Sequence, residues 1–263
     1  MSDVVRYEQS GSIVTITMNR PDQLNALNDE LSLGVAEGLE RAASDAGVRC
    51  VVLQGAGRAF SSGADLSQLE PAYRAGEKVD LAIWLRERYH KVILPIVSME
   101  KPVIAAVNGV AAGAGCSIAL ACDFRIASDK AKFFQAFIKV GLVADSGANY
   151  FLPRLVGFAK AMELALLGDV IDAETALRYG LVTRVAPHDE LDKQVAAFAE
   201  QLAAGPTNAF GASKRALHFG ALHDLASTLE VEAELQSVMG MTEDHREGVM
   251  AFLEKRAPNF RGE

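Results

Sequence analysis

Two short apolar segments, each followed by a glycine-bearing loop, constrain the fold of this 263-residue chain more than any other feature. The segment 50–53 precedes the loop 55–66, and the segment 103–107 precedes the loop 108–117. Apolar runs of this length are typical of strands buried on both faces of a parallel sheet. Because ligand sites in such folds lie at the loops that follow strands, we expect the functional residues in these two loops.

Helix and strand patterns alternate on both sides of these loops. Residues 4–7 and 13–18 have the pattern of a hairpin. Asn28 can cap a helix whose residues Leu31, Val35 and Leu39 form one apolar face, and this helix is expected to run to about Gly47. The alternation predicts an α/β fold built from repeated βαβ units.

The last quarter of the chain has a different pattern. From Leu191 onward it is almost wholly helical, with a break at Gly205-Pro206. We therefore expect an α/β core over residues 1–200 and a helical C-terminal region over residues 201–263.

Charge and cysteine content exclude several classes of protein. The net charge of −8 argues against a broad basic surface for nucleic acid. Cys50, Cys116 and Cys122 are odd in number and form no C-x-x-C pair, so neither a disulfide framework nor a structural zinc site is expected, and no metal is predicted.

Neither export nor membrane insertion is expected. The N-terminus has no basic start followed by an apolar stretch, and the cysteine content suits a reducing cytoplasm. The longest apolar tract, 102–121, contains Asn108 and is rich in Gly and Ala, so a strand, a turn and a buried helix explain it better than a transmembrane span.

The two glycine-bearing loops could bind an anionic oxygen. Backbone N–H groups at a helix start are unpaired, so two such loops side by side could direct two donors at one carbonyl oxygen. Each such donor is typically worth ~3 kcal/mol when negative charge develops on that oxygen. Alternatively, the glycines serve only tight turns and close packing. Neither loop fits a P-loop or a dinucleotide fingerprint.

Over essentially its whole length the sequence resembles the crotonase, or enoyl-CoA hydratase/isomerase, superfamily. The resemblance is carried by motifs that occur in the family's order. They are Asn19-Arg-Pro21 with Asn25-Ala-Leu-Asn28, the strings 57–66 and 101–109, and the closing Glu247-Gly248 with 252–256.

The resemblance implies both a fold and an assembly. The fold is a crotonase-like spiral of ββα units with a helical C-terminal trimerisation region. The assembly is a homotrimer, or a homohexamer formed as a dimer of trimers. The ligand is an acyl-coenzyme A thioester that serves as the substrate, with no separate cofactor and with no nucleic-acid or membrane partner.

The resemblance also implies roles for individual residues. The amides of Ala64 and Ala114 would form an oxyanion hole for the thioester carbonyl. Phe252 and Lys255 match residues that reach a neighbouring subunit's CoA in family trimers. Ser67 departs from the family, since hydratases often carry Lys there. The remaining CoA- or substrate-binding positions are Ala26, Leu27, Ser62, Gly63, Asp65, Leu66, Gly113, Phe137 and Leu142.

The side chains at the family's catalytic positions favour isomerisation over hydration. Family hydratases place two glutamates around a water, and this chain has Ser117 and Phe137 at those positions. Neither side chain can transfer a proton near neutral pH. Asp145 remains, at a position where several family isomerases use an aspartate. Its apolar neighbours Phe134, Phe137, Leu142 and Val143 are expected to raise its pKa by desolvation.

The string 135–145 is particularly similar to the phenylacetate-pathway isomerases, which convert 1,2-epoxyphenylacetyl-CoA into an oxepin-CoA and can interconvert 3-enoyl and 2-enoyl thioesters. The expected function is therefore acyl-CoA isomerisation, with Asp145 as acid and base. Two alternatives remain open. One is an enoyl-CoA hydratase of fatty-acid or aromatic-acid degradation, and the other is a catalytically silent CoA-binding scaffold.

Other candidate groups are weaker. The five histidines have no metal or triad spacing and are expected to be surface or packing residues. Cys116 is expected to be a small buried thiol. Trp84 and Tyr89 lie in a helical region that could cover the acyl pocket, and their part in substrate choice cannot be derived from the sequence.

Overall fold

The main sheet has six strands in the order β1-β2-β3-β5-β7-β10. The computed structural model describes residues 3–263. Strand β1 is antiparallel to β2, and every other neighbouring pair is parallel. The strands are β1 Val5–Ser10, β2 Ile13–Met18, β3 Cys50–Gly55, β5 Val103–Val107, β7 Phe124–Ser128 and β10 Arg184–Ala186.

A second, smaller sheet has the order β4-β6-β8-β9. Its strands are β4 Ala59–Ser61, β6 Val110–Ala112, β8 Lys132–Phe134 and β9 Ile171–Asp172. Each long strand β3, β5 and β7 is followed by one short strand, β4, β6 and β8 in turn. The chain therefore winds through both sheets in ββα turns, which confirms the predicted α/β spiral. The predicted loop 108–117 contains β6, because its backbone pairs with β4 and β8, and it also contains the start of the helix Ala114–Ala121.

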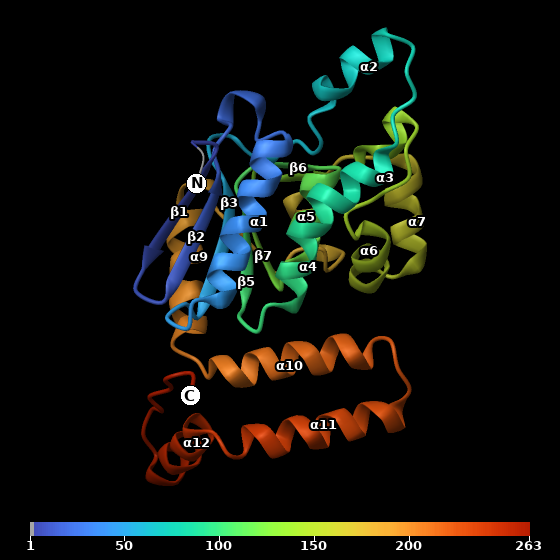
Figure 1. Cartoon of the computed structure of the whole chain (residues 1–263). Helices are drawn as coiled ribbons and strands as arrows, with labels where there is room; N and C mark the ends of the chain where they lie inside the picture. The colour runs from blue at the N-terminus through green and yellow to red at the C-terminus, as the bar shows by residue number, and fades with distance from the viewer. Residues whose placement is uncertain (1–2) are drawn as a thin grey trace.

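Helices cover both faces of the main sheet (Figure 1). On one face, α1 and α4 pack against Val51 and Leu53, and on the other α9 packs against Cys50 and Val52. Alternate residues of one strand thus enter two cores, as expected for a strand buried on both faces. The helices up to α5 are η1 Pro21–Gln23, α1 Asp29–Ser44, η2 Leu66–Leu69, α2 Glu70–Arg74, α3 Leu81–Trp84, the π-helical turn η3 Leu85–Tyr89, α4 His90–Ser98 and α5 Ala114–Ala121.

The remaining helices are η4 Ala136–Val140, α6 Ala148–Val156, α7 Phe158–Leu167, α8 Ala173–Arg178, η5 His188–Glu190, α9 Leu191–Ala203, α10 Thr207–Gly220, α11 Leu225–Met239 and α12 Glu243–Glu254. Helices α10 to α12 extend away from the sheets (Figure 1). The break at Gly205-Pro206 is confirmed. The boundary predicted after residue 200 falls inside α9, which packs on the sheet through Ala203. The division into two regions stays a prediction.

Residues 3–55 largely follow the predictions from sequence. Asn28 caps α1, because its side chain accepts a 2.9 Å hydrogen bond from the Leu31 amide. Helix α1 ends at Ser44, three residues before the predicted Gly47, because Asp45 adopts an extended conformation. Strand β1 continues to Ser10, so the hairpin turn is shorter than predicted.

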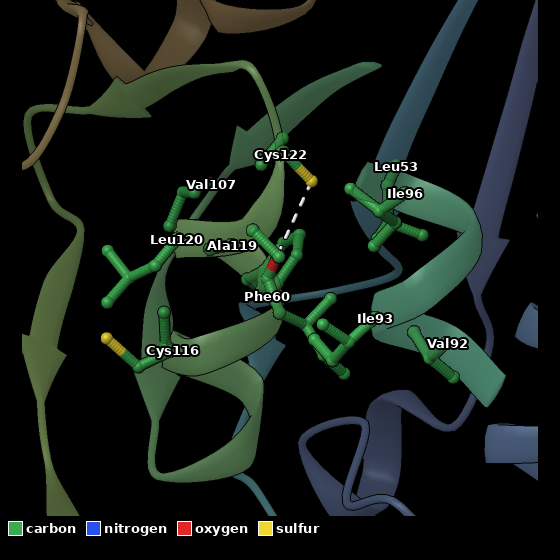
Figure 2. Close-up of a cluster of buried hydrophobic side chains, with 14 of the residues drawn as sticks. Leu53, Phe60, Val92, Ile93, Ile96, Val107, Cys116, Ala119, Leu120 and Cys122 are labelled. Carbon is green, nitrogen blue, oxygen red and sulfur yellow. Dashed lines mark hydrogen bonds between the residues drawn. The ribbon is translucent and has the colours of Figure 1, made fainter. Parts of the chain in front are cut away.

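The apolar tract 102–121 contains β5, β6 and the eight-residue α5. Figure 2 shows Phe60 between Ala119 of α5 and Ile93 of α4, where all three side chains are buried. Within residues 3–263, no helix is long and apolar enough to cross a membrane.

Candidate active site

The loop after β4 and the N-terminus of α5 touch each other. Gly63 has φ +91°, and a Cβ atom built on it would lie 2.7 Å from the Ala112 carbonyl oxygen and 3.5 Å from the Ala114 amide nitrogen. A Cβ on Gly115 would lie 2.6 Å from the Ser61 side chain. Only glycine permits this approach together with the left-handed backbone at Gly63. The two predicted loops are therefore neighbours in space.

The amide nitrogens of Ala64 and Ala114 belong to these two neighbouring segments. Leu27 pairs with the first segment, because its amide donates to Gly63 O at 2.8 Å and its carbonyl accepts from the Asp65 amide at 3.1 Å. The Ala64 amide lies between these two bonds, one to the Gly63 carbonyl and one from the Asp65 amide, and takes part in neither. Ala114 is the first residue of α5. Among residues 3–263, neither amide donates a hydrogen bond to protein, so both are available to a ligand oxygen.

Asp145 lies in the turn between η4 and α6. The positive φ angles of Ser146 (53°) and Gly147 (82°) bend this turn. The Ser146 hydroxyl donates a 2.7 Å hydrogen bond to Asp145 Oδ1. Burial raises the pKa of Asp145, while the Ser146 hydrogen bond and the charge of His90 oppose the shift.

The predicted direction of the Asp145 pKa shift is confirmed, with one difference in its cause. Phe137 is buried and Leu142 is half-buried, as expected for neighbours that exclude water. Val143, however, is 78% exposed and contributes little to desolvation. Because strand pairing does not fix the backbone of this turn, the sequence could not show which way Val143 points.

Ser117 and Phe137 lie beside Gly113, the residue before Ala114. The Ser117 hydroxyl donates a 3.1 Å hydrogen bond to the Gly113 carbonyl, one residue before Ala114. The Phe137 ring comes within 3.9 Å of a Cβ built on Gly113. These positions, which hold glutamates in the family's hydratases, are thus occupied by a bonded hydroxyl and an aromatic ring.

Several predicted acyl-CoA contacts gather near this point. Leu66 and Leu142 line one cavity of about 560 Å³, together with Leu69, Glu70, Tyr73, Arg74 and Val140. Ser62 is held to the η1 turn, because its amide donates to Leu24 O at 2.9 Å. Ala26 adjoins the same loop, since its carbonyl accepts a 2.6 Å hydrogen bond from Arg20, which also pairs with Asp65.

Asp65 has an unexpected partner. Arg20 forms a 2.9 Å ion pair with its carboxylate, and Ser67 donates a 2.6 Å hydrogen bond to it. Although burial raises the pKa of Asp65, these hydrogen bonds together lower it below its ordinary value. Ser67, at the position where the resemblance leads us to expect a Lys in many hydratases, therefore supports the loop instead of adding a cation.

Phe252 and Lys255 lie far from these residues in the single chain. Figure 1 places α12 at the other end of the molecule from β6. The Phe252 side chain is 82% exposed. Their contact with a neighbouring subunit's ligand stays a prediction.

No pattern in the sequence predicts the polar groups that act on Asp145. His90, expected to be a surface or packing residue, has an exposed side chain, and its charge opposes the rise in the pKa of Asp145. Tyr89 is buried, and Asp145 and Asp65 both act on its hydroxyl. The one sequence feature that pointed to Tyr89 and His90 was their place in the helical region expected to cover the acyl pocket. Cys116 is a buried thiol as predicted, and burial raises its pKa to about 12.

Comparison with known proteins shows which family the chain belongs to. The family model described as enoyl-CoA hydratase/isomerase matches residues 8–263, and the chain belongs to this family. The chain is 45% identical to a protein named probable enoyl-CoA hydratase from Rhodobacter capsulatus, over 98% of each chain. It is 40% identical to the 1,2-epoxyphenylacetyl-CoA isomerase of Escherichia coli, over 100% of this chain and 99% of the relative.

Solved structures share the fold. The crystal structure of an enoyl-CoA hydratase from Mycobacterium smegmatis has a TM-score of 0.91 and 32% sequence identity, and it covers 98% of this chain and 99% of its own. The fold is therefore the crotonase fold.

Proposed function

We propose that the protein is an acyl-CoA isomerase, in which Asp145 moves a proton along the acyl group while the amides of Ala64 and Ala114 stabilise an enolate. Its substrates would be a 3-enoyl-CoA, a ring epoxide of phenylacetyl-CoA, or both. The observation that carries the proposal is the partly desolvated carboxylate of Asp145, in a chain where Ser117 and Phe137 stand at the positions that the resemblance assigns to the hydratase glutamates.

For a 3-enoyl thioester the proposed reaction has two proton transfers. The Asp145 carboxylate removes a proton from C2, and the electrons move onto the thioester oxygen as a dienolate. The two amides donate to that oxygen, where each is worth ~3 kcal/mol. The Asp145 carboxyl then returns the proton to C4, the C2–C3 double bond forms, and the carboxylate is regenerated. A raised pKa brings Asp145 closer to the basicity that such a step requires.

Replacement of Asp145 by Asn tests the assignment. The amide matches the carboxyl in size but cannot accept the proton, so turnover of a 3-enoyl-CoA should fall by about 10²–10⁴-fold. Binding of a saturated acyl-CoA should change little. Turnover near that of the unmodified protein would remove Asp145 as the base.

Hydration is the competing activity, favoured by the name of the Rhodobacter capsulatus relative. A 2-enoyl-CoA separates the two reactions, because hydration bleaches the absorbance of the conjugated thioester and isomerisation leaves most of it. A silent CoA-binding scaffold would bind thioesters without exchanging their hydrogen with heavy water. We further propose that the protein is cytoplasmic and that it assembles as a homotrimer or homohexamer. Sedimentation analysis would test the assembly.

A further inference from the structure

Tyr89 carries a buried hydroxyl that the proposed reaction does not use. Its side chain is 3% exposed, and within residues 3–263 the hydroxyl oxygen has no hydrogen-bond partner. Buried tyrosine hydroxyls normally find a partner, and one that lacks it requires an explanation. Tyr89 is also the last residue of the π-helical turn Leu85–Tyr89, and such turns occur frequently at functional sites.

The helix places Tyr89 near the Asp145 turn. Ile93 lies one helical turn further along the same face, and its Cγ2 atom is 3.6 Å from a Cβ built on Gly147. Figure 2 shows Ile93 pointing from α4 toward Phe60 in the core. The face that carries Tyr89 and Ile93 therefore packs toward the turn that holds Asp145.

The phenol of Tyr89 is a hydrogen-bond donor at any physiological pH. Burial raises its pKa, and the carboxylates of Asp145, Asp29 and Asp65 raise it further against the lowering effect of Arg88. A protonated phenol cannot act as a base here, but it can donate to an oxygen atom. The phenol is therefore a buried donor on the helix face that packs toward the Asp145 turn.

We propose that the Tyr89 hydroxyl is a specificity determinant that favours acyl groups carrying an oxygen atom, such as a cyclic ether or a ring epoxide. This inference rests on the proposed acyl-CoA site. No protein group among residues 3–263 accepts a hydrogen bond from this hydroxyl, and the proposed acceptor is an oxygen atom of the bound acyl group. A hydrocarbon acyl group leaves the hydroxyl unpaired, and sites built to hydrogen-bond one atom discriminate strongly against analogues that lack it.

Ser32 supplies the matched control. Its hydroxyl is also buried without a partner, and it lies on α1, which packs against α4. If a buried water joined Ser32 to Tyr89, both hydroxyls would have only a structural role, and removal of either would lower stability. Tyr89→Phe and Ser32→Ala therefore distinguish a ligand contact from an internal one.

The test uses thioesters that differ by one atom and do not react. Cyclohexylacetyl-CoA and the 3-yl and 4-yl isomers of tetrahydropyranylacetyl-CoA have the same shape, with CH₂ replaced by oxygen at one position, and none has a leaving group on C3 of the acyl chain. We expect at least one oxygen isomer to bind Tyr89→Phe about tenfold more weakly than the unmodified protein. Cyclohexylacetyl-CoA should bind both proteins equally, Ser32→Ala should bind like the unmodified protein, and Tyr89→Phe should melt at no lower temperature.

The inference would be overturned if Tyr89→Phe weakened the binding of all three ligands equally. It would also be overturned if Tyr89→Phe changed the binding of none of them. Loss of thermal stability in both variants would assign the hydroxyl to an internal water network and overturn it as well. Because these ligands bind without turnover, the result is independent of whether Asp145 proves to be the base.

Discussion

The hydroxyl of Ser146 donates a 2.7 Å hydrogen bond to Oδ1 of Asp145. Burial raises the pKa of this carboxyl, and the serine hydrogen bond is the largest contribution in the opposite direction. These two effects act on the pKa of Asp145 in opposite directions. The residue next to Asp145 in the same turn therefore tunes the basicity of the proposed catalytic group.

Replacement of Ser146 by Gly should move the acid limb of the pH profile to higher pH. Glycine accepts the φ of 53° at this position, so the change removes the hydroxyl without backbone strain. Without that bond the charged carboxylate is less favoured, its pKa rises, and a higher pH is needed to deprotonate it. We expect kcat/KM at pH 5 to fall roughly tenfold, with little change on the alkaline plateau. An unshifted profile would contradict this account.

Replacement of Asp145 by Asn should stabilise the protein near neutral pH. Burial raises the pKa of Asp145 in the folded state. The folded protein therefore loses stability as the pH increases through that pKa, because it then holds a desolvated negative charge. The neutral amide does not carry this penalty. At pH 7 the melting temperature should rise by about 2–4 °C, the shift expected for about 1 kcal/mol. Below the ordinary aspartate pKa the two proteins should melt together, and an equal gain at every pH would point to another cause.

Replacement of Gly63 by Ala should separate the two proposed oxyanion donors. The new methyl group would lie 2.7 Å from the Ala112 carbonyl oxygen, so the loop must move away from α5. Loss of one donor should lower kcat by about 10²–10³-fold.

Gly76→Ala is the matched control, because Gly76 has a similar φ of 74° and no neighbouring atom within 4 Å of a Cβ. Both variants carry backbone strain, and only the Gly63 variant should lose activity. Similar losses in both would show that general destabilisation causes the defect.

The ion pair between Lys214 and Asp123 should anchor α10 to the core. The Lys214 Nζ lies 2.8 Å from Asp123 Oδ2 and 2.7 Å from the Ile96 carbonyl oxygen. Lys214→Met leaves the half-buried carboxylate, whose side chain is 18% exposed, without its cation, which should cost about 1–3 kcal/mol of unfolding free energy at pH 7.

The pH dependence and a double variant check this interpretation. Burial raises the pKa of Asp123 despite the ammonium group. Without Lys214 that pKa should rise further, and the loss of stability should shrink as pH falls and the carboxyl becomes protonated. The double variant Lys214→Met, Asp123→Asn should recover part of the loss measured by urea unfolding. No recovery would assign the effect to the lost lysine packing.

Local patterns in the sequence predicted the regular elements well. The Asn28 cap and the apolar face of Leu31, Val35 and Leu39 depend on residues a few positions apart, and the structure contains both. Strand β5 begins and ends where its apolar run does, because burial on both faces requires an apolar residue at every position.

The candidate site was predicted from sequence only in part. Resemblance located Ala64, Ala114 and Asp145, and the structure shows why the first two can be neighbours: Gly63 and Gly115 let the loop and the helix approach closely. The pairing of Arg20 with Asp65 could not be anticipated, because it joins residues 45 positions apart. No local pattern encodes such a distant contact.

The sequence alone determined the alternation of strands and helices, the loops that follow the strands, and the residues at the family's catalytic positions. These properties depend on periodicity, capping and residue identity along a short stretch of chain. Tertiary structure decided which amides are left unpaired, how deeply Asp145 is buried, and that the Tyr89 hydroxyl has no partner. Desolvation and unpaired hydrogen-bonding groups arise only when distant segments exclude water from one another, so they are properties of the packed molecule.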